Sequence, residues 1–469
     1  MLRPYQSKAV ALARAHLAER PVLCLPTGSG KTVIAAEIVR LAAERGKRTL
    51  FLCDRREIVA QTQEKYKVEA GLILAGEDRT DHPHQIAAAQ TLNRRALPKA
   101  DLLIVDECRL SLAPTMRRIV EQYPVRIGLD ATPVRDDGKG LGALYGIILE
   151  PVTTAELLAG GWLAPYRYFA PDKPSLKGVK RVRGDYEPEG AADAMMQRHV
   201  VGGIVASYLK HGGTIVQERG TPQAATMLLF ACTVRHSIAM RDAFRSAGVK
   251  AEHADGTTPK GERERVFNGL RDRSISVVCN VGLVGYGFDA PSLDGVILAR
   301  PTKSLAVYRQ QVGRALRPPG LAVILDHAGN VYEHGMPDCP VTWSLEDGLT
   351  RSSSPGIAWC RSCYAVFAPH TRSCPCCGEE REAQRVEVVH HAAEMREVKE
   401  VVKRPVSDDV VAFLKQAHQR GFKPRWAQFA YQRQRGYFPR GDFMGAVRKE
   451  MEGCLIPACG FCGAVRVMA

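Results

Sequence analysis

The sequence predicts an α/β fold with two tandem parallel-sheet domains, followed by a small cysteine module and a basic C-terminal region. Short apolar runs alternate with segments of helical periodicity over the first two thirds of the chain, which is the pattern of strand–helix units in a parallel sheet. Two Cys-x-x-Cys pairs then follow. We expect domains at residues 1–165 and 166–345, the cysteine module at 355–380 and the basic region at 381–469.

The chain has 469 residues, a formal charge of +15 and a pI of about 9.2. This excess favours a polyanionic partner, most simply nucleic acid, although a solvated basic surface would give the same charge. No stretch approaches the roughly 20 apolar residues of a membrane span. Residues 1–6 lack the basic-then-apolar order of a signal peptide. We therefore expect a cytoplasmic protein that does not enter a membrane.

A phosphate-binding turn is predicted at residues 26–32, which read Pro-Thr-Gly-Ser-Gly-Lys-Thr. The apolar run at 22–25 predicts a buried strand before the turn, and the periodicity of 33–43 predicts a helix after it. Gly28 and Gly30 would let backbone amides face an anion at the N-terminus of this helix.

Lys31 would then reach the outer phosphates of ATP, and the Thr32 hydroxyl would ligate Mg²⁺. Leu25 stands where the strict pattern has glycine, so the alternative is a glycine turn that merely precedes a lysine. The residues that we expect to contact the nucleotide are Arg3, Gln6, Thr27, Gly28, Ser29, Gly30, Lys31, Thr32 and Asp289.

Two adjacent carboxylates, Asp106 and Glu107, follow the apolar run at 101–105. Such a pair is costly after a buried strand unless a cation joins it. Asp106 would hold Mg²⁺ through water, and Glu107 would position and deprotonate the attacking water. An acidic helix cap is the alternative.

The second domain offers Arg314 and Arg317, which we expect at i and i+3 on one helical face. Facing the phosphates from across the cleft, they would act as arginine fingers; a solvated basic helix is the alternative. We expect residues 164–190 to be a connector, followed by a helix at 191–211.

The cysteine pairs predict a tetrahedral Zn²⁺ site made by Cys360, Cys363, Cys374 and Cys377, with Cys376 as a spare. Free buried thiols are the alternative. A further trio, Cys454, Cys459 and Cys462, has too few members to decide whether it binds a metal.

Cationic and aromatic residues interleave between Lys415 and Lys449. Cations for phosphates and flat rings for bases are typical of a nucleic-acid surface. Trp426 and Phe429 could instead form the core of a small helical domain, and both interpretations can hold at once.

With these residues in this order, residues 1–345 resemble the superfamily 2 helicases, which are RecA-like, nucleic-acid-dependent ATPases. Gln6 resembles the family's adenine-reading motif. The phosphate, acidic and arginine elements resemble motifs I (Lys31, Thr32), II (Asp106, Glu107), III (residues 131–133), V (Asp289) and VI (residues 310–317). Two residues depart from the pattern: Arg109, where His or Asp is usual, and Asp130, where Thr or Ser is commoner. Both lie on the route that couples ATP to nucleic acid.

A narrower resemblance is to the bacterial RadD-type repair helicases, through residues 2–6, 184–186, 325–330 and 421–439 and the zinc module. It implies a motor that uses ATP, Mg²⁺ and Zn²⁺ and acts on DNA in recombination or repair. Single-strand-binding or recombination proteins would be its candidate partners. An RNA helicase and a nucleic-acid-binding scaffold with a relic ATP site are the alternatives.

Overall fold

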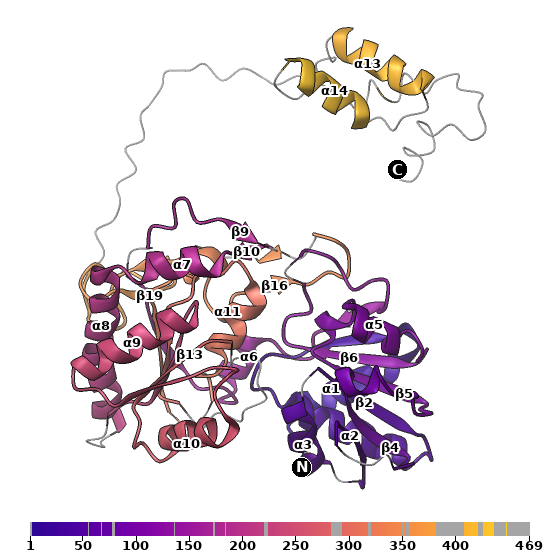
Figure 1. The fold of residues 1–469 in the computed structure, drawn as a ribbon, viewed down its shortest axis with the longest axis horizontal. Helices are drawn as coiled ribbons and strands as arrows, with labels where there is room; N and C mark the ends of the chain where they lie inside the picture. The colour runs from indigo at the N-terminus through magenta and orange to yellow at the C-terminus, as the bar shows by residue number, and fades with distance from the viewer. Residues whose placement is uncertain are drawn as a thin grey trace. The chain divides into compact units, whose positions relative to one another are not determined.

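The computed structural model describes residues 2–54, 56–66, 68–76, 80–135, 137–171, 174–182, 184–219, 224–282, 293–317, 320–348, 351–352, 356–380, 408–420, 425–435 and 447. The chain divides into two compact units, Met1–Ala383 and Gln384–Ala469. The first unit contains two α/β lobes, each built on its own sheet (Figure 1).

Lobe 1 is a seven-stranded sheet in the order β3-β4-β2-β5-β6-β1-β7, and its strand pairs are all parallel. Its strands are β1 (Pro21–Cys24), β2 (Thr49–Cys53), β3 (Gly71–Ile73), β4 (His84–Ala88), β5 (Leu102–Asp106), β6 (Arg126–Asp130) and β7 (Ile147–Leu149). Its helices are α1 (Pro4–Ala15), η1 (Leu17–Glu19), α2 (Lys31–Ala43), α3 (Arg56–Lys65), α4 (Ala89–Leu92), η2 (Cys108–Leu110), α5 (Pro114–Val120) and α6 (Thr154–Ala159).

The strands of lobe 1 form because their apolar residues are buried on both faces. Every residue of β1, β2, β4 and β6 is buried, as expected for parallel strands that helices cover. Helix α2 contributes Ile34, Ile38 and Val39 to the same core. Parallel strands bring their carboxyl ends to one edge, so β1, β5 and β6 end side by side.

Lobe 2 is an eight-stranded sheet in the order β12-β13-β11-β14-β15-β8-β19-β18. Its strands are β8 (Tyr166–Phe169), β11 (Met227–Phe230), β12 (Ala251–Ala254), β13 (Val277–Asn280), β14 (Gly295–Leu298), β15 (Ala322–Asp326), β18 (Ala358–Trp359) and β19 (Ala365–Phe367). Two small hairpins join β9 (Arg181–Val182) to β10 (Asp185–Tyr186) and β16 (Val341–Thr342) to β17 (Arg351–Ser352). Its helices are α7 (Pro188–Met195), α8 (Arg198–Arg219), α9 (Val234–Ser246), α10 (Lys260–Arg271), α11 (Leu305–Val312) and α12 (Val331–His334).

The connector predicted at residues 164–190 is more structured than the sequence indicated. It contains β8, which pairs in parallel with β15 and antiparallel with β19. The Tyr168 hydroxyl donates to Asp326 at 2.8 Å, so long-range pairing fixes a strand that is too short to stand out in sequence. The helix expected at 191–211 is two helices, α7 and α8.

Residues 85–92 would be expected from their sequence to form one short strand, but β4 ends at Ala88 because the chain turns there into α4. The expectation about the two arginines of the second domain is also wrong. Helix α11 ends at Val312, so Arg314 and Arg317 do not share a helical face. A Cβ on Gly313 would lie 2.6 Å from the Thr27 Cβ, and this close packing against lobe 1 occurs where the helix stops.

The cysteine segment extends the lobe 2 sheet. Strands β18 and β19 form an antiparallel pair, and β19 covers the edge of β8. In the second unit, α13 (Asp408–Gln419) packs on α14 (Arg425–Arg435) through Val410, Leu414, Ala417, Ala427 and Tyr431. Among the described residues, no helix is long and apolar enough to cross a membrane.

Candidate ATP and metal sites

The turn between β1 and α2 requires glycine at two positions. Gly28 and Gly30 have φ values of 87° and 85°, a region that side chains rarely adopt. A Cβ on Gly28 would lie 2.9 Å from Leu163 Cδ2, and one on Gly30 would lie 2.7 Å from Gln6 Nε2. Helix α2 begins at Lys31, followed by Thr32, with no side-chain cap. Its first amides are therefore left for an anion.

Helix α1 holds this turn from one side. The Tyr5 hydroxyl donates to the Ser29 carbonyl at 2.8 Å, and Gln6 Nε2 donates to the same oxygen at 3.1 Å. Gln6 Oε1 accepts from the Arg3 backbone at 3.0 Å. The Arg3 guanidinium lies 4.6 Å from the centre of the Trp162 ring. Tyr5 and Trp162 are not among the predicted site residues, although Tyr5 stands in the same short segment as Gln6.

Buried polar atoms without partners occur in the turn and just after β6. Among the described residues, Ser29 Oγ and Thr132 Oγ1 are buried and accept or donate no hydrogen bond. Burial lowers the pKa of Lys31 and raises the pKa of Asp106 to about 6. A magnesium–triphosphate complex fits such a site, because it supplies an anion for the lysine and amides and a cation for the carboxylate.

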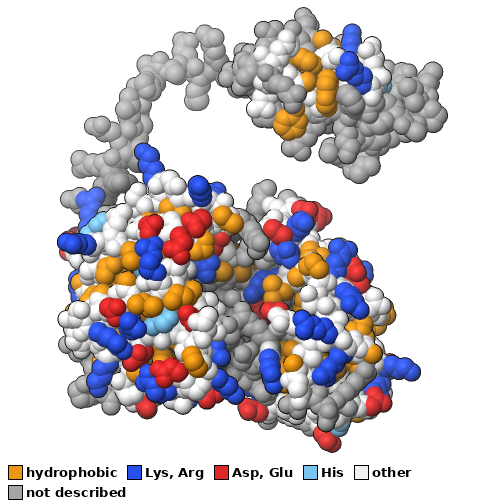
Figure 2. Space-filling view, in the orientation of Figure 1, with side chains coloured by type: hydrophobic (Ala, Val, Ile, Leu, Met, Phe, Trp, Pro, Cys, Tyr) orange, Lys and Arg blue, Asp and Glu red, His pale blue; other side chains and the backbone are white. Residues whose placement is uncertain are grey.

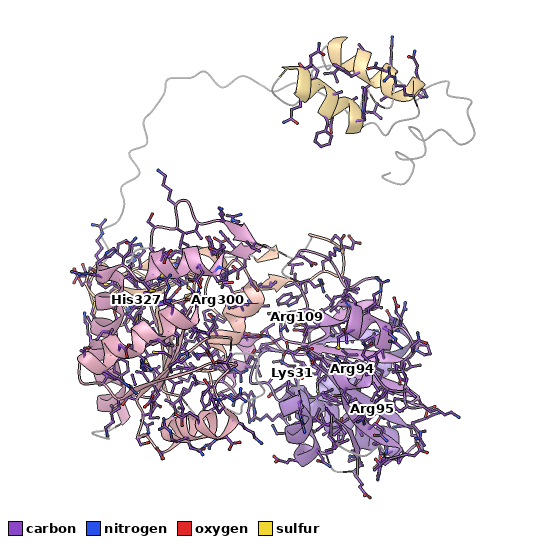
Figure 3. The ribbon with its side chains drawn as sticks, viewed as in Figure 1. Lys31, Arg94, Arg95, Arg109, Arg300 and His327 are labelled. Atoms are coloured by element: carbon purple, nitrogen blue, oxygen red, sulfur yellow. The ribbon has the colours of Figure 1, made fainter. Side chains whose placement is uncertain are left out.

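Glu107 lies where the two lobes meet. Its backbone is in the left-handed region, with φ of 50°. Its Oε2 accepts hydrogen bonds from Arg109 Nη1 in lobe 1 and from Gln310 Nε2 in lobe 2, the latter at 3.1 Å. Lys31 and Arg109 both lie on the side of lobe 1 that faces lobe 2 (Figure 3).

The remaining predicted residues are Thr27, the two arginines and Asp289. Thr27 contacts lobe 2, because it packs against Gly313. Arg314 and Arg317 follow Gly313 outside the helix. Asp289 lies outside the described residues.

The chain matches two family models in tandem. Residues 1–135 match "Type III restriction enzyme, res subunit", and residues 215–319 match "Helicase conserved C-terminal domain". A 51.5 kDa protein of a Lactococcus phage is 33% identical over 390 residues, which are 80% of this chain and 82% of the phage protein. The putative ATP-dependent helicase IRC3 of Saccharomyces cerevisiae is 26% identical over 351 residues, which are 68% of this chain and 49% of that protein. The chain belongs to the ATP-dependent helicases of superfamily 2.

A translocase and a solved helicase structure are also similar to this helicase. The DNA 3'-5' translocase XPB2 of Sulfurisphaera tokodaii is 34% identical over 178 residues, which are 35% of this chain and 39% of that protein. The solved structure of the DUF1998 helicase MrfA bound to DNA and AMPPNP has a TM-score of 0.49 at 16% identity, over 69% of this chain and 47% of that chain. The helicase thus spans most of the phage relative and about half of the yeast one.

Four cysteines gather beside the lobe 2 sheet. The Sγ atoms of Cys360, Cys363, Cys374 and Cys377 all lie within 4.8 Å of one another. Cys376 stays outside this group, and its backbone amide donates to Cys374 Sγ. This is the predicted quartet. Four thiolates in a compact cluster fit the ligand set that tetrahedral Zn²⁺ prefers. Cys454, Cys459 and Cys462 lie outside the described residues.

The predicted basic surface is described only in part. Phe429 is 48% exposed on α14, whereas Tyr431 is buried against α13. Phe429 therefore does not form part of the core, whereas Trp426 is partly buried against it. Nucleic-acid binding by this surface stays a prediction. On the face of the two lobes in Figure 2, lysines and arginines are interspersed with acidic residues rather than gathered in one patch.

Proposed function

We propose that this helicase is a DNA translocase of the RadD type, which hydrolyses ATP when nucleic acid bridges its two lobes. The main support is the contact between the lobes over the phosphate-binding turn. Gln310 of lobe 2 donates to Glu107 of lobe 1, and Gly313 packs against Thr27. A ligand bound by this turn would therefore affect the contacts that both lobes make there.

Each lobe has a distinct part in hydrolysis. The amides after Gly28 and Gly30, with Lys31, would grip the phosphates, and Arg3, Gln6 and Asp289 would select the nucleoside. Bound Mg²⁺, held by Thr32 and Asp106, would supply charge compensation for the phosphates. Glu107 would orient and deprotonate the attacking water. Arg314 and Arg317 would stabilise the charge that develops on the transferred group.

Charge and short sequence features support DNA as the nucleic acid. The formal charge of +15 suits a polyanion. Residues 2–6, 184–186, 325–330 and 421–439 and the cysteine quartet resemble features of the RadD-type repair helicases. We therefore extend the proposal to recombination or repair, with a single-strand-binding or recombination protein as a candidate partner.

Phosphate release tests the proposal. The full chain is incubated with ATP and Mg²⁺, alone or with single-stranded, duplex or branched DNA, or with RNA of the same lengths. We expect DNA to raise the turnover number well above the rate without nucleic acid. Greater stimulation by RNA would make the protein an RNA helicase, and no release with any nucleic acid would leave a binding scaffold.

A further inference from the structure

The two residues that depart from the superfamily pattern contact each other. Asp130 is fully buried at the end of β6, and Arg109 lies in the short helix after β5. The Asp130 carboxylate accepts from the Arg109 backbone at 2.9 Å, from Arg109 Nη1 at 3.1 Å and from the Thr132 backbone at 3.0 Å. Three donors thus satisfy a buried charge, and one of them is a cation.

The same guanidinium nitrogen also reaches the expected general base. Arg109 Nη1 donates to Glu107 Oε2, which accepts from Gln310 as well. Arg109 therefore bridges two carboxylates. One is the buried Asp130, and the other is Glu107 at the contact between the lobes.

This arrangement requires both residues to be present. A neutral residue at 109 would leave Asp130 charged and unpaired in the interior, which is strongly destabilising. A neutral residue at 130 would remove the charge that holds the Arg109 guanidinium in place. The guanidinium could then move together with the Glu107 carboxylate instead of fixing its position. Single changes should therefore be harmful and a matched double change tolerated.

We propose that Asp130, acting through Arg109, is a positioning residue that fixes the carboxylate of Glu107. The charged pair stands where His or Asp and Thr or Ser are usual. This inference rests on the proposed ATPase function, because it assigns a role at the same site.

The test measures the turnover number and the KM for ATP of the full chain with saturating single-stranded DNA. Arg109→His and Asp130→Asn should each lower kcat by roughly tenfold or more, since small displacements of catalytic groups carry such costs. The KM and the affinity for a fluorescent ATP analogue should stay within about twofold, because the phosphate turn is untouched. The double variant Arg109→His/Asp130→Thr should recover kcat to within about threefold of the original protein.

A second arm separates positioning from folding. In a Glu107→Gln background, adding Asp130→Asn should not lower the residual rate further, because the group being positioned is gone. Unfolding midpoints of all variants check that each is folded at the assay temperature. The exposed pair Arg117 and Glu121, 2.7 Å apart, supplies the matched control, and Arg117→His/Glu121→Thr should leave kcat unchanged.

Three results would overturn the positioning role: unchanged kcat in the single variants, a double variant as slow as the product of the singles, or a further loss in the Glu107→Gln background. If the unaltered protein fails to hydrolyse ATP with any nucleic acid, the proposed function itself fails. The two failures are therefore distinguishable.

Discussion

Both lobes contain a strand that leads directly into a helix, but the N-termini of the two helices differ. In lobe 1, β1 leads into α2 through Gly30, and no side chain caps the helix. In lobe 2, β11 leads into α9 through Thr233, whose hydroxyl accepts from the His236 amide at 3.3 Å. The Thr233 hydroxyl satisfies one of the amides at the start of α9, whereas no side chain satisfies the first amides of α2. Lobe 1 thus has the architecture of an anion site, and lobe 2 has that of a partner that approaches it.

The largest effects are expected where lobe 1 would meet phosphate. Lys31→Ala and Glu107→Gln should each lower DNA-stimulated ATP hydrolysis by roughly 10²- to 10³-fold, as loss of one transition-state contact does in other enzymes. Phosphate release at saturating DNA measures this. Arg117→Ala, on the exposed face of α5, is the control. Near-normal turnover in Lys31→Ala would contradict the assignment of the phosphate-binding site to lobe 1.

A loss of stability confined to lobe 2 is expected when its cysteine cluster is broken. Cys363→Ser should lower the melting temperature by on the order of 10 °C if the cluster holds a structural metal, because each kcal/mol corresponds to a few degrees. Cys376→Ser is the matched control and should change little. Zinc content measured on both variants should fall only in the first. Equal melting temperatures would mean that the thiols hold no metal.

Acid should weaken lobe 2 more than lobe 1. Burial lowers the pKa of His211, His236 and His327 to about 4, and it lowers that of His334 as well; in lobe 1, burial lowers the pKa of His84. A lowered histidine pKa stabilises the fold above the unfolded value of about 6.5. That stability is lost as the pH falls from about 6.5 toward 4. Hydrogen exchange at pH 7 and pH 5 should show lobe 2 amides losing more protection, and equal losses in both lobes would contradict this.

The smallest expected effect is that of the lobe 2 cap. Thr233→Ala should destabilise lobe 2 by about 1 kcal/mol, the usual cost of losing a helix cap. Nucleotide affinity should not change, because this helix end is not predicted to bind phosphate. Thr233→Ser keeps the hydroxyl and is the control in chemical denaturation. Weaker nucleotide binding in Thr233→Ala would show that the capped helix contributes to the site after all.

The sequence predicted the parts of the site that depend on neighbouring residues. The turn at 26–32, the acidic pair after β5 and the grouping of four cysteines with Cys376 left out all follow from local spacing. The zinc itself, the domain boundaries and the catalytic roles remain predictions. Tyr5 was missed because it reaches the turn at 26–32 only when α1 folds against that turn. Trp162 was missed because it meets Arg3 and Tyr5 only when the chain after α6 folds against α1.

Errors in the predicted elements have the same origin. Strand β8 was missed because its four residues are stabilised by β15 and β19, which are distant in sequence. The helical face expected for Arg314 and Arg317 was wrong because α11 ends at Val312, just before the glycine that packs on lobe 1. Periodicity describes a helix but does not reveal the tertiary contact at its end.

The place of β8 in its sheet has a consequence for how the protein is made. A ribosome releases β8 before every other strand of lobe 2, yet Tyr168 finds its partner Asp326 158 residues later, and β19 comes later still. Until then both edges of β8 have no strand to pair with, a state that invites pairing with another chain. Translation that stops between β15 and β19 would release a chain in which one of these edges stays open.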